Sequence, residues 1–184
     1  MGIFDRFIKN NKTDKEFGVP KNDQEKWCLD ICSVWCFAVN GKQNLLGGGF
    51  TSKSTKKILS RDWGLTIDEN SSNVLIQEYV IPKINGKYED LTVLAWEYCC
   101  AAQLLCLGYA SEIITRETYN LHMFEIAKKL QSKFTSWQEM IENYFDGYLN
   151  ATGNEDELEF RIKCFLSLNS ENSDNFKTDW NTKF

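Results

Sequence analysis

One nearly continuous apolar stretch, from about residue 88 to residue 107, constrains the fold more than any other feature of this sequence. It contains no proline, and after Asp90 its only charged residue is Glu97. Its apolar side chains fall on most sides of the helix that it would form, which is the pattern of a helix buried all round. Gly108 follows, as glycine often follows the last turn of a helix. We therefore expect one central helix with other helices packed around it.

The rest of the chain shows helical rather than alternating periodicity. Polar residues that commonly cap helices precede most of the amphipathic segments. These segments predict an all-α, single-domain bundle of about seven to eight helices with orthogonal or irregular packing, built from residues 22–168. The helix that begins near residue 71 is expected to stop at Pro82. Besides the central helix, the expected helices cover about residues 22–39, 52–62, 71–81, 115–134, 136–148 and 156–168.

Two glycine-containing segments allow a second interpretation. Asn85-Gly86 is a strong hairpin signal, but the nearby Pro82 and the acidic residues that follow favour helices on both sides instead. Three glycines at 47–49 precede a Thr-Ser-Lys sequence, yet they lack the spacing of a phosphate-binding loop. A flexible turn that leads into a Thr or Ser cap is favoured over a phosphate site.

The two ends of the chain differ in composition from the domain. Residues 1–21 are interpreted as a short amphipathic helix over 2–9 and a polar linker. We expect this helix to dock on the domain, because so short a helix buries little area in a membrane. Residues 169–184 form a polar acidic tail, which is either loose or held to the domain by Phe176, Trp180 and Phe184.

Charge and hydropathy exclude several functions. The chain has 21 Lys and Arg against 26 Asp and Glu, a net charge of −5, so it lacks the positive surplus that nucleic acids and anionic membranes require. No uninterrupted apolar run approaches the roughly 20 residues that span a bilayer, because Asp90 and Glu97 interrupt even the stretch over 88–107. The first residues also lack a secretory signal. We expect a cytoplasmic protein that binds no nucleic acid, has no stable membrane anchor and prefers a basic or neutral partner.

Seven cysteines are many for 184 residues, and an odd number cannot all pair within the chain. Cys28, Cys32 and Cys36 recur every fourth residue and therefore share one helical face. They lack the second group of ligands that a structural zinc site usually has. Reduced thiols that pack as small apolar side chains are favoured. The sequence thus predicts neither a metal site nor a cofactor.

Few residues have the character of catalytic groups. His122 is the only histidine, and no serine or cysteine hydrolase signature accompanies it. Glu97 lies in the most apolar helix, where a carboxylate needs a partner or has an altered pKa. A structural hydrogen bond to a Trp indole or a Tyr hydroxyl is favoured there over a role as general acid. No catalytic residue is therefore assigned.

Three segments carry a resemblance to a known family: residues 96–110, the stretch K-L-Q-S-K-F-T-S-W-Q-E and the stretch N-Y-F-D-G-Y. Together they make the chain similar, over about residues 25–150, to bacterial family 1266 of the domains of unknown function. The resemblance implies a fold but no settled activity. Its members typically carry a Trp-Asp pair on this helix and an arginine shortly after it. Here Glu97 replaces the aspartate, and Cys100 stands where the arginine belongs.

Two classes of function remain. The first is a non-catalytic cytoplasmic protein-binding module, most concretely an immunity protein that neutralises a secreted bacterial toxin by occluding its basic active site. Small size, acidity and many aromatic residues favour this class. The alternative is an enzyme of unrecognised type that uses the carboxylate of Glu97 in a pocket of the bundle.

The candidate binding residues belong mostly to the acidic start of the last helix and to the aromatic edge of the helix before it. The sequence leaves the oligomeric state open. The candidates are Glu97, Tyr144, Tyr148, Glu155, Asp156, Glu157, Glu159 and Trp180.

Overall fold

A computed structural model describes residues 18–86, 88 and 91–184. Across these residues it contains helices and no strand, so the predicted all-α fold is confirmed and the hairpin alternative at Asn85-Gly86 is wrong. The amphipathic helix expected over residues 2–9 lies outside the described residues.

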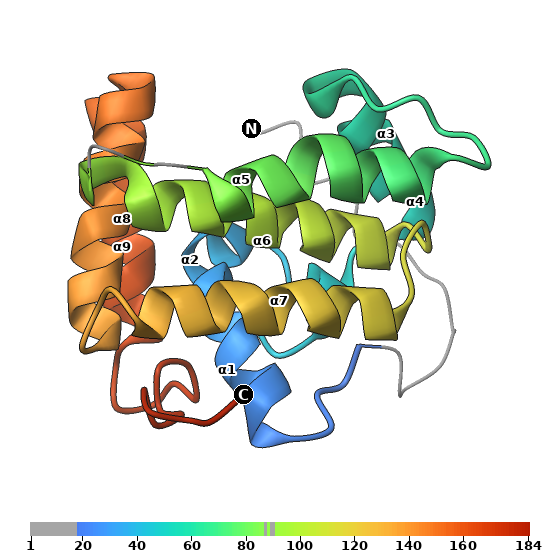
Figure 1. Cartoon of the computed structure of the whole chain (residues 1–184). Helices are drawn as coiled ribbons and strands as arrows, with labels where there is room; N and C mark the ends of the chain where they lie inside the picture. The colour runs from blue at the N-terminus through green and yellow to red at the C-terminus, as the bar shows by residue number, and fades with distance from the viewer. Residues whose placement is uncertain (1–17, 87, 89–90) are drawn as a thin grey trace.

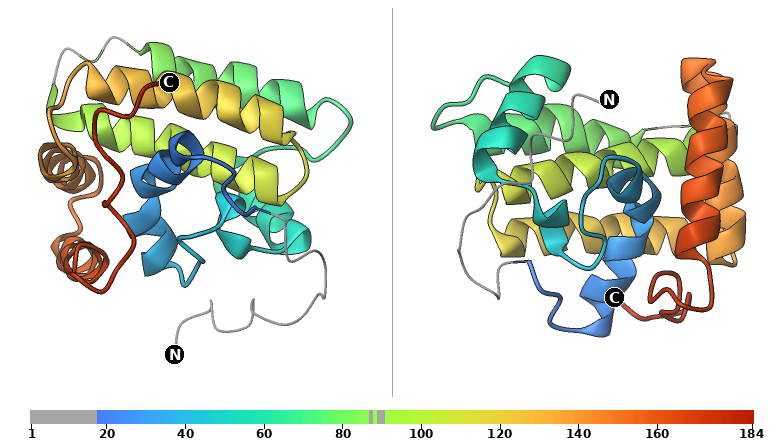
Figure 2. Two further views of the ribbon diagram at one scale, coloured as in Figure 1. Left: turned by 90° about the horizontal axis from the view of Figure 1, so that it is seen from below. Right: turned by 180° about the vertical axis from the view of Figure 1, so that it is seen from behind.

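The predicted central helix is α6, Leu94–Ala110, which follows the short 3-10 turn η4, Leu91–Val93. Every residue from Tyr98 to Ala110 is buried. Helices α3, α5, α7 and α8 all pack on α6, which explains why its apolar residues need no preferred side. Figures 1 and 2 show α6 in the middle layer, with α5 and α7 on one side of it and α1, α2 and α3 on the other.

Most of the other helices begin at capping residues. Asn22, Thr51, Thr115 and Ser136 each accept a hydrogen bond from the backbone N–H three residues further on. Gly64 ends α3 in the left-handed conformation, with a φ of 69°. The elements are α1 (Asp23–Ile31), α2 (Ser33–Ala38), η2 (Leu46–Gly49), α3 (Ser52–Trp63), α7 (Arg116–Gln131), α8 (Trp137–Thr152) and α9 (Glu155–Leu168).

The single helix predicted over residues 22–39 is wrong in one respect, because the chain breaks at Cys32. There φ is −118° and ψ is 16°, outside the helical range. The Ser33 hydroxyl donates to the backbone oxygen of Asp30 over 3.1 Å, which is the local side-chain bond that competes with a continuing helix. After this break, α2 packs against α9.

The predicted helix end at Pro82 is also wrong. Helices α4 (Ser71–Val74), η3 (Leu75–Val80) and α5 (Ile81–Asn85) follow one another without a break. Element η3 is a π-helix, in which the N–H of Ile81 donates to the oxygen of Ile76 five residues earlier. Pro82 then lies directly after this π-helical turn, whose changed hydrogen-bond register accommodates a residue without an N–H inside a continuous helix. Counted as one, these segments bring the described α-helices to eight.

The three consecutive glycines form a close turn against α6. Gly47, Gly48 and Gly49 have φ values of 78°, 66° and 65°, a region that other residues rarely adopt. A Cβ atom on Gly47 would lie 3.1 Å from the Cβ of Ala110. Glycine is therefore required here both for the backbone conformation and for the approach of η2 to α6.

Residues 169–184 run from the end of α9 back across the molecule to α1 (Figures 1 and 2). Of the two behaviours that the sequence left open, the structure shows the second. Phe176 and Trp180 are buried, and Phe184 packs on the core. This part of the chain therefore completes the hydrophobic core.

Candidate protein-binding surface

Helices α8 and α9 stand side by side at one end of the molecule, across the direction of α5, α6 and α7 (Figures 1 and 2). The inner side of α8 packs on α6 and η4, while α9 packs on α8 and α2. Gly147 permits the close approach of α8, because a Cβ atom there would lie 2.6 Å from the Cβ of Trp96. Helix α9 therefore keeps one whole side in contact with solvent.

The acidic residues at the start of α9 have a role in the helix itself. Asn154 accepts a hydrogen bond of 3.1 Å from the backbone N–H of Glu157 and so caps the helix. Carboxylates in the first turn are also favourable beside the positive end of the helix dipole. Even so, Glu155, Asp156 and Glu159 remain exposed. Glu159 pairs with Lys163 over 2.6 Å, but this pair lies at the surface, with the two side chains 68% and 67% exposed, so it is weak and a partner's cation can replace Lys163.

Apolar side chains continue the solvent-facing side of α9. Glu155, Glu159, Ile162 and Leu166 are spaced by four, three and four residues, so they lie along one side of the helix, named here the α9 outer face. The Leu166 side chain is 62% exposed. Of the seven exposed large hydrophobic residues in the described part of the chain, three are on α9: Ile162 and Leu166 on this face, and Phe160 further round the helix. Such a local concentration of exposed apolar residues is typical of an interaction site.

Glu157, Tyr144 and Tyr148 do not belong to that face. Both tyrosines are buried, and Arg161 joins them to α9. The Arg161 Nη1 atom donates to the Tyr144 hydroxyl over 2.9 Å, and its guanidinium lies 4.6 Å from the centre of the Tyr148 ring. Its Nη2 atom lies 3.1 Å from Glu157. These residues hold α9 against α8, so we place Tyr144 and Tyr148 in the core of the candidate region and not at its surface. Trp96 packs against the two tyrosine rings from α6.

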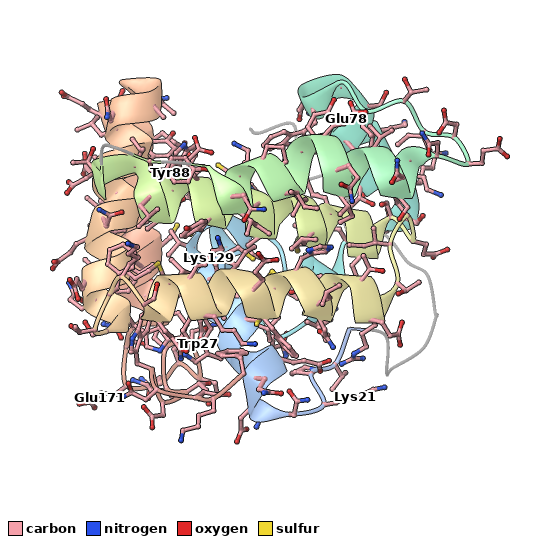
Figure 3. The ribbon with its side chains drawn as sticks, in the orientation of Figure 1. Lys21, Trp27, Glu78, Tyr88, Lys129 and Glu171 are labelled. Atoms are coloured by element: carbon pink, nitrogen blue, oxygen red, sulfur yellow. The ribbon has the colours of Figure 1, made fainter. Side chains whose placement is uncertain are left out.

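Glu97 forms an ion pair instead of the expected bond to a Trp or Tyr. Its Oε2 atom accepts from the Lys83 Nζ atom over 2.5 Å, and about a quarter of each side chain is exposed. The Tyr88 hydroxyl donates to the backbone oxygen of Lys83, so Tyr88, labelled in Figure 3, closes the same corner between α5 and α6. The Glu97 charge is thus already neutralised by a neighbour, as in a structural ion pair.

Replacement of Glu97 by glutamine is expected to change the free energy of unfolding by less than about 1 kcal/mol, because a partly exposed ion pair contributes little. Leucine at this position should have a similarly small effect, since solvent can hydrate the Lys83 ammonium group. Urea unfolding of both variants beside the parent measures this. A loss of several kcal/mol in the glutamine variant would show that the carboxylate is in a much less hydrated site.

Trp180 lies far from the other candidates. Its ring centre is 4.9 Å from that of Trp137, at the first residue of α8, whereas Tyr148 lies eleven residues further along that helix. Eleven residues of helix span about 16 Å. The structure thus brings Glu157 together with the two tyrosines through Arg161, and it separates Trp180 from them.

A buried ion pair near the start of α7 was not expected from the sequence. The Glu25 side chain is only 2% exposed and accepts from Arg116 Nε over 2.9 Å and from Arg116 Nη2 over 2.5 Å. Asn120 and the Lys21 backbone N–H also donate to it. Burial raises the pKa of Glu25, but these hydrogen bonds outweigh burial and lower the pKa to about 2. No local pattern reveals this pair, since its members are 91 residues apart.

A second buried carboxylate, Asp30, binds two consecutive residues near the C-terminus of the chain. It accepts hydrogen bonds of 2.9 Å from the Asn175 side chain and from the Phe176 backbone N–H. Burial is the larger effect and raises the pKa of Asp30 to about 7, although both hydrogen bonds favour the charged form. Helical periodicity had given no sign that Asp30 faces inward beside Ile31.

The pKa of Asp30 predicts a fall in stability as the pH rises. Between about pH 4 and pH 7 the folded chain keeps this proton while the unfolded chain loses it, so the free energy of unfolding decreases. In an Asp30→Asn variant this contribution should be absent, and the difference from the parent should therefore vary with pH. Urea unfolding from pH 4 to pH 8 measures it, with Asp23→Asn, an exposed position, as the control. Identical slopes in the parent and the Asp30 variant would contradict the assignment.

The remaining candidate groups are unlike catalytic centres. Burial lowers the pKa of His122, and Glu125, 3.9 Å away, opposes this effect only in part. All seven cysteines are buried and none is in a disulfide. Burial raises the pKa of Cys100 to about 12, despite the positive charges of Lys83 and Arg161 nearby. Among residues 18–86, 88 and 91–184, no group of three or more His, Cys, Asp or Glu side chains is placed to hold a metal ion.

These features define an all-α bundle domain. Its α9 outer face is acidic and apolar, and several polar side chains are buried and hydrogen-bonded inside it. The chain belongs to the family described as "protein of unknown function (DUF1266)", whose family model matches residues 9–180. No curated protein and no solved structure matches the chain. No helix in the described part of the chain is long and apolar enough to cross a membrane. The family match extends beyond the segments that carried the resemblance and includes Trp180.

Proposed function

We propose that this chain is a non-catalytic protein-binding module whose α9 outer face docks on a basic partner protein. One observation carries the proposal: exposed apolar residues and exposed carboxylates follow one another along the same side of α9. Apolar side chains would supply the contact area, and Glu155 and Glu159 would attract a positively charged surface. The net charge of −5 acts in the same direction.

Within this class, the concrete proposal is a cytoplasmic immunity protein that covers the basic active site of a secreted bacterial toxin. The protein needs only a rigid acidic surface for this, and α9 is held firmly by Arg161, Tyr144 and Tyr148. The enzyme alternative has less support, because its carboxylate, Glu97, is already paired with Lys83.

The test is binding to the product of the adjacent gene, measured at low and high salt. Neutralising Glu155 and Glu159 to glutamine should slow association about three- to tenfold at low salt and much less at high salt. Leu166→Gln should instead speed dissociation, because it removes an apolar contact. Glu157 is left unchanged because it pairs with Arg161.

The matched control is Glu69→Gln with Glu78→Gln, which removes the same charge from two exposed positions outside α9. It should leave the association rate nearly unchanged. Absence of any binding would remove the immunity proposal. If the α9 substitutions change neither the association rate nor the dissociation rate, the interface lies on another face.

A further inference from the structure

The last ten residues are held by the rest of the chain in the way that a protein holds a bound peptide. We call residues 175–184 the C-terminal segment. Side chains donate to its backbone oxygens: Trp137 Nε1 to Thr178 over 3.0 Å, and Trp27 Nε1 to Trp180 over 3.2 Å. Contacts with main-chain groups bind an extended segment whatever its sequence. The surface that provides such contacts, here named the docking surface, comes from α1, α7 and α8 and comprises Gln24, Trp27, Asp30, Gln131 and Trp137.

Two glutamines complete the main-chain contacts. Gln131 Nε2 donates to the oxygen of Thr182 over 2.9 Å and also to that of Trp180. Gln24 Nε2 donates to the oxygen of Lys183 over 2.7 Å. Together with the two indoles, these side chains bind backbone oxygens at four positions between Thr178 and Lys183. Side chains of the docking surface therefore hold the main chain at several points between Phe176 and Lys183, whereas a loosely packed chain end would need no such hydrogen bonds.

Aromatic side chains of the segment provide specificity. Phe176, Trp180 and Phe184 are four residues apart. The Trp180 ring centre lies 5.1 Å from that of Trp27, and its Nε1 atom donates to the backbone oxygen of Phe134 over 3.1 Å. Phe176 and Phe184 contact the rings of Trp137 and Trp27 at 5.5 and 5.3 Å. Trp27, labelled in Figure 3, therefore lies where α1 meets the segment.

The connection between α9 and the segment is short and exposed. Residues 170–174 are mostly exposed, and their backbone bond is local, from Ser173 to Ser170. Phe176, the first anchored aromatic residue, has a φ of 58°, a conformation that bulky residues rarely adopt. The chain thus turns sharply where the segment begins, and a short exposed connection beside a well-bound terminal segment is a place where that segment can be exchanged between copies.

We propose that the docking surface also takes the C-terminal segment of a second copy of this chain, so that two chains exchange residues 175–184 and form a dimer. Every contact made within one chain can be made between two chains, because both the segment and the surface are identical in the partner copy. The proposal is independent of the α9 outer face, which shares no residue with the docking surface.

The experiment changes the length of the connection in the full chain. Deletion of Glu171, Asn172 and Ser173 removes about 10 Å of reach, so the segment can no longer return easily to its own docking surface. Light scattering after gel filtration should give twice the mass of one chain. Three glycine and serine residues inserted at the same place are the matched control, and they should leave the protein monomeric.

Trp180→Ala in the shortened chain tests whether the dimer forms through the docking surface. It should return the protein to a monomer, because the segment then lacks its main anchor. A folded shortened chain that stays monomeric overturns the proposal, and so does a dimer that survives Trp180→Ala.

If the shortened chain does not fold, the proposal is tested on the unmodified chain. It is partly unfolded in urea at about 1 mM, a concentration comparable with that of a tethered segment, and then refolded. A dimer fraction that grows with protein concentration and is absent in Trp180→Ala supports exchange. An entirely monomeric product overturns it.

Discussion

Replacement of Arg116 by alanine is expected to lower the free energy of unfolding by about 3–5 kcal/mol, because it leaves the buried Glu25 carboxylate without its cation. Two guanidinium nitrogens bond both oxygens of Glu25, and Arg116 also donates to the backbone oxygen of Val19. Arg116→Lys should lose part of this stability, since an ammonium group cannot make the same pair of parallel bonds. Urea unfolding at neutral pH measures both variants.

The same ion pair has a pH signature. The pKa of Glu25 is lowered to about 2 in the folded chain, so its contribution is fully present above about pH 4.5 and is lost as the pH falls toward 2. The Arg116→Ala variant should lose less stability over that range than the parent. Arg61→Ala is the control, because Arg61 pairs with Asp62 at the surface and its removal should change little. Equal effects of the two substitutions would contradict the assignment.

Replacement of Trp180 by alanine is expected to cost about 3–5 kcal/mol, the range for removal of a large buried aromatic side chain. The substitution removes contacts with Trp27 and Trp137 and the hydrogen bond to the backbone oxygen of Phe134. Trp180→Phe should cost less, because it keeps a ring in the same place. Urea unfolding monitored by circular dichroism gives both values.

Phe160→Ala is the matched control for this prediction, since the Phe160 side chain is 46% exposed on α9. Its unfolding midpoint should change little. A Trp180 variant that unfolds at the parent's midpoint would show that the C-terminal segment does not contribute to the core, and it would remove the basis of the exchange proposal as well.

The family resemblance implies an aspartate and an arginine on α6, where this chain has Glu97 and Cys100, and the structure shows what surrounds these two residues. Glu97 finds its cation on α5, at Lys83. Cys100, which stands where the pattern has an arginine, lies close enough to Lys83 and Arg161 for both positive charges to influence its pKa. Positive charge in this region is thus supplied by α5 and α9 instead of by α6 itself.

Much of the fold was determined by local sequence. The apolar stretch predicted α6 because a helix with apolar residues on most sides is stable only when it is surrounded. Caps such as Thr115 and Ser136 marked helix starts because the bonding groups lie within three residues of one another. The acidic residues near Asp156 predicted the start of α9 in the same way. These features depend on spacing along the chain, which a sequence contains directly.

Tertiary structure decided the candidate surfaces. The end of α1 at Cys32 and the passage of the helix through Pro82 combine local hydrogen bonding with packing of α2 on α9 and of α5 on α6, and helical periodicity alone shows neither. Tyr144 and Tyr148, which the sequence presented as candidate contact residues, are buried and stabilise the packing of α9 instead.

Glu25 with Arg116, and Asp30 with Phe176, are pairs far apart in sequence. The free energy of such a pair depends on burial and on the distance between partners, and both exist only once the chain has folded. By itself the sequence determined an acidic all-α protein with a central buried helix. The fold decided which charged side chains are buried and hydrogen-bonded and which remain exposed on the α9 outer face, because the solvent access of a side chain depends on tertiary packing.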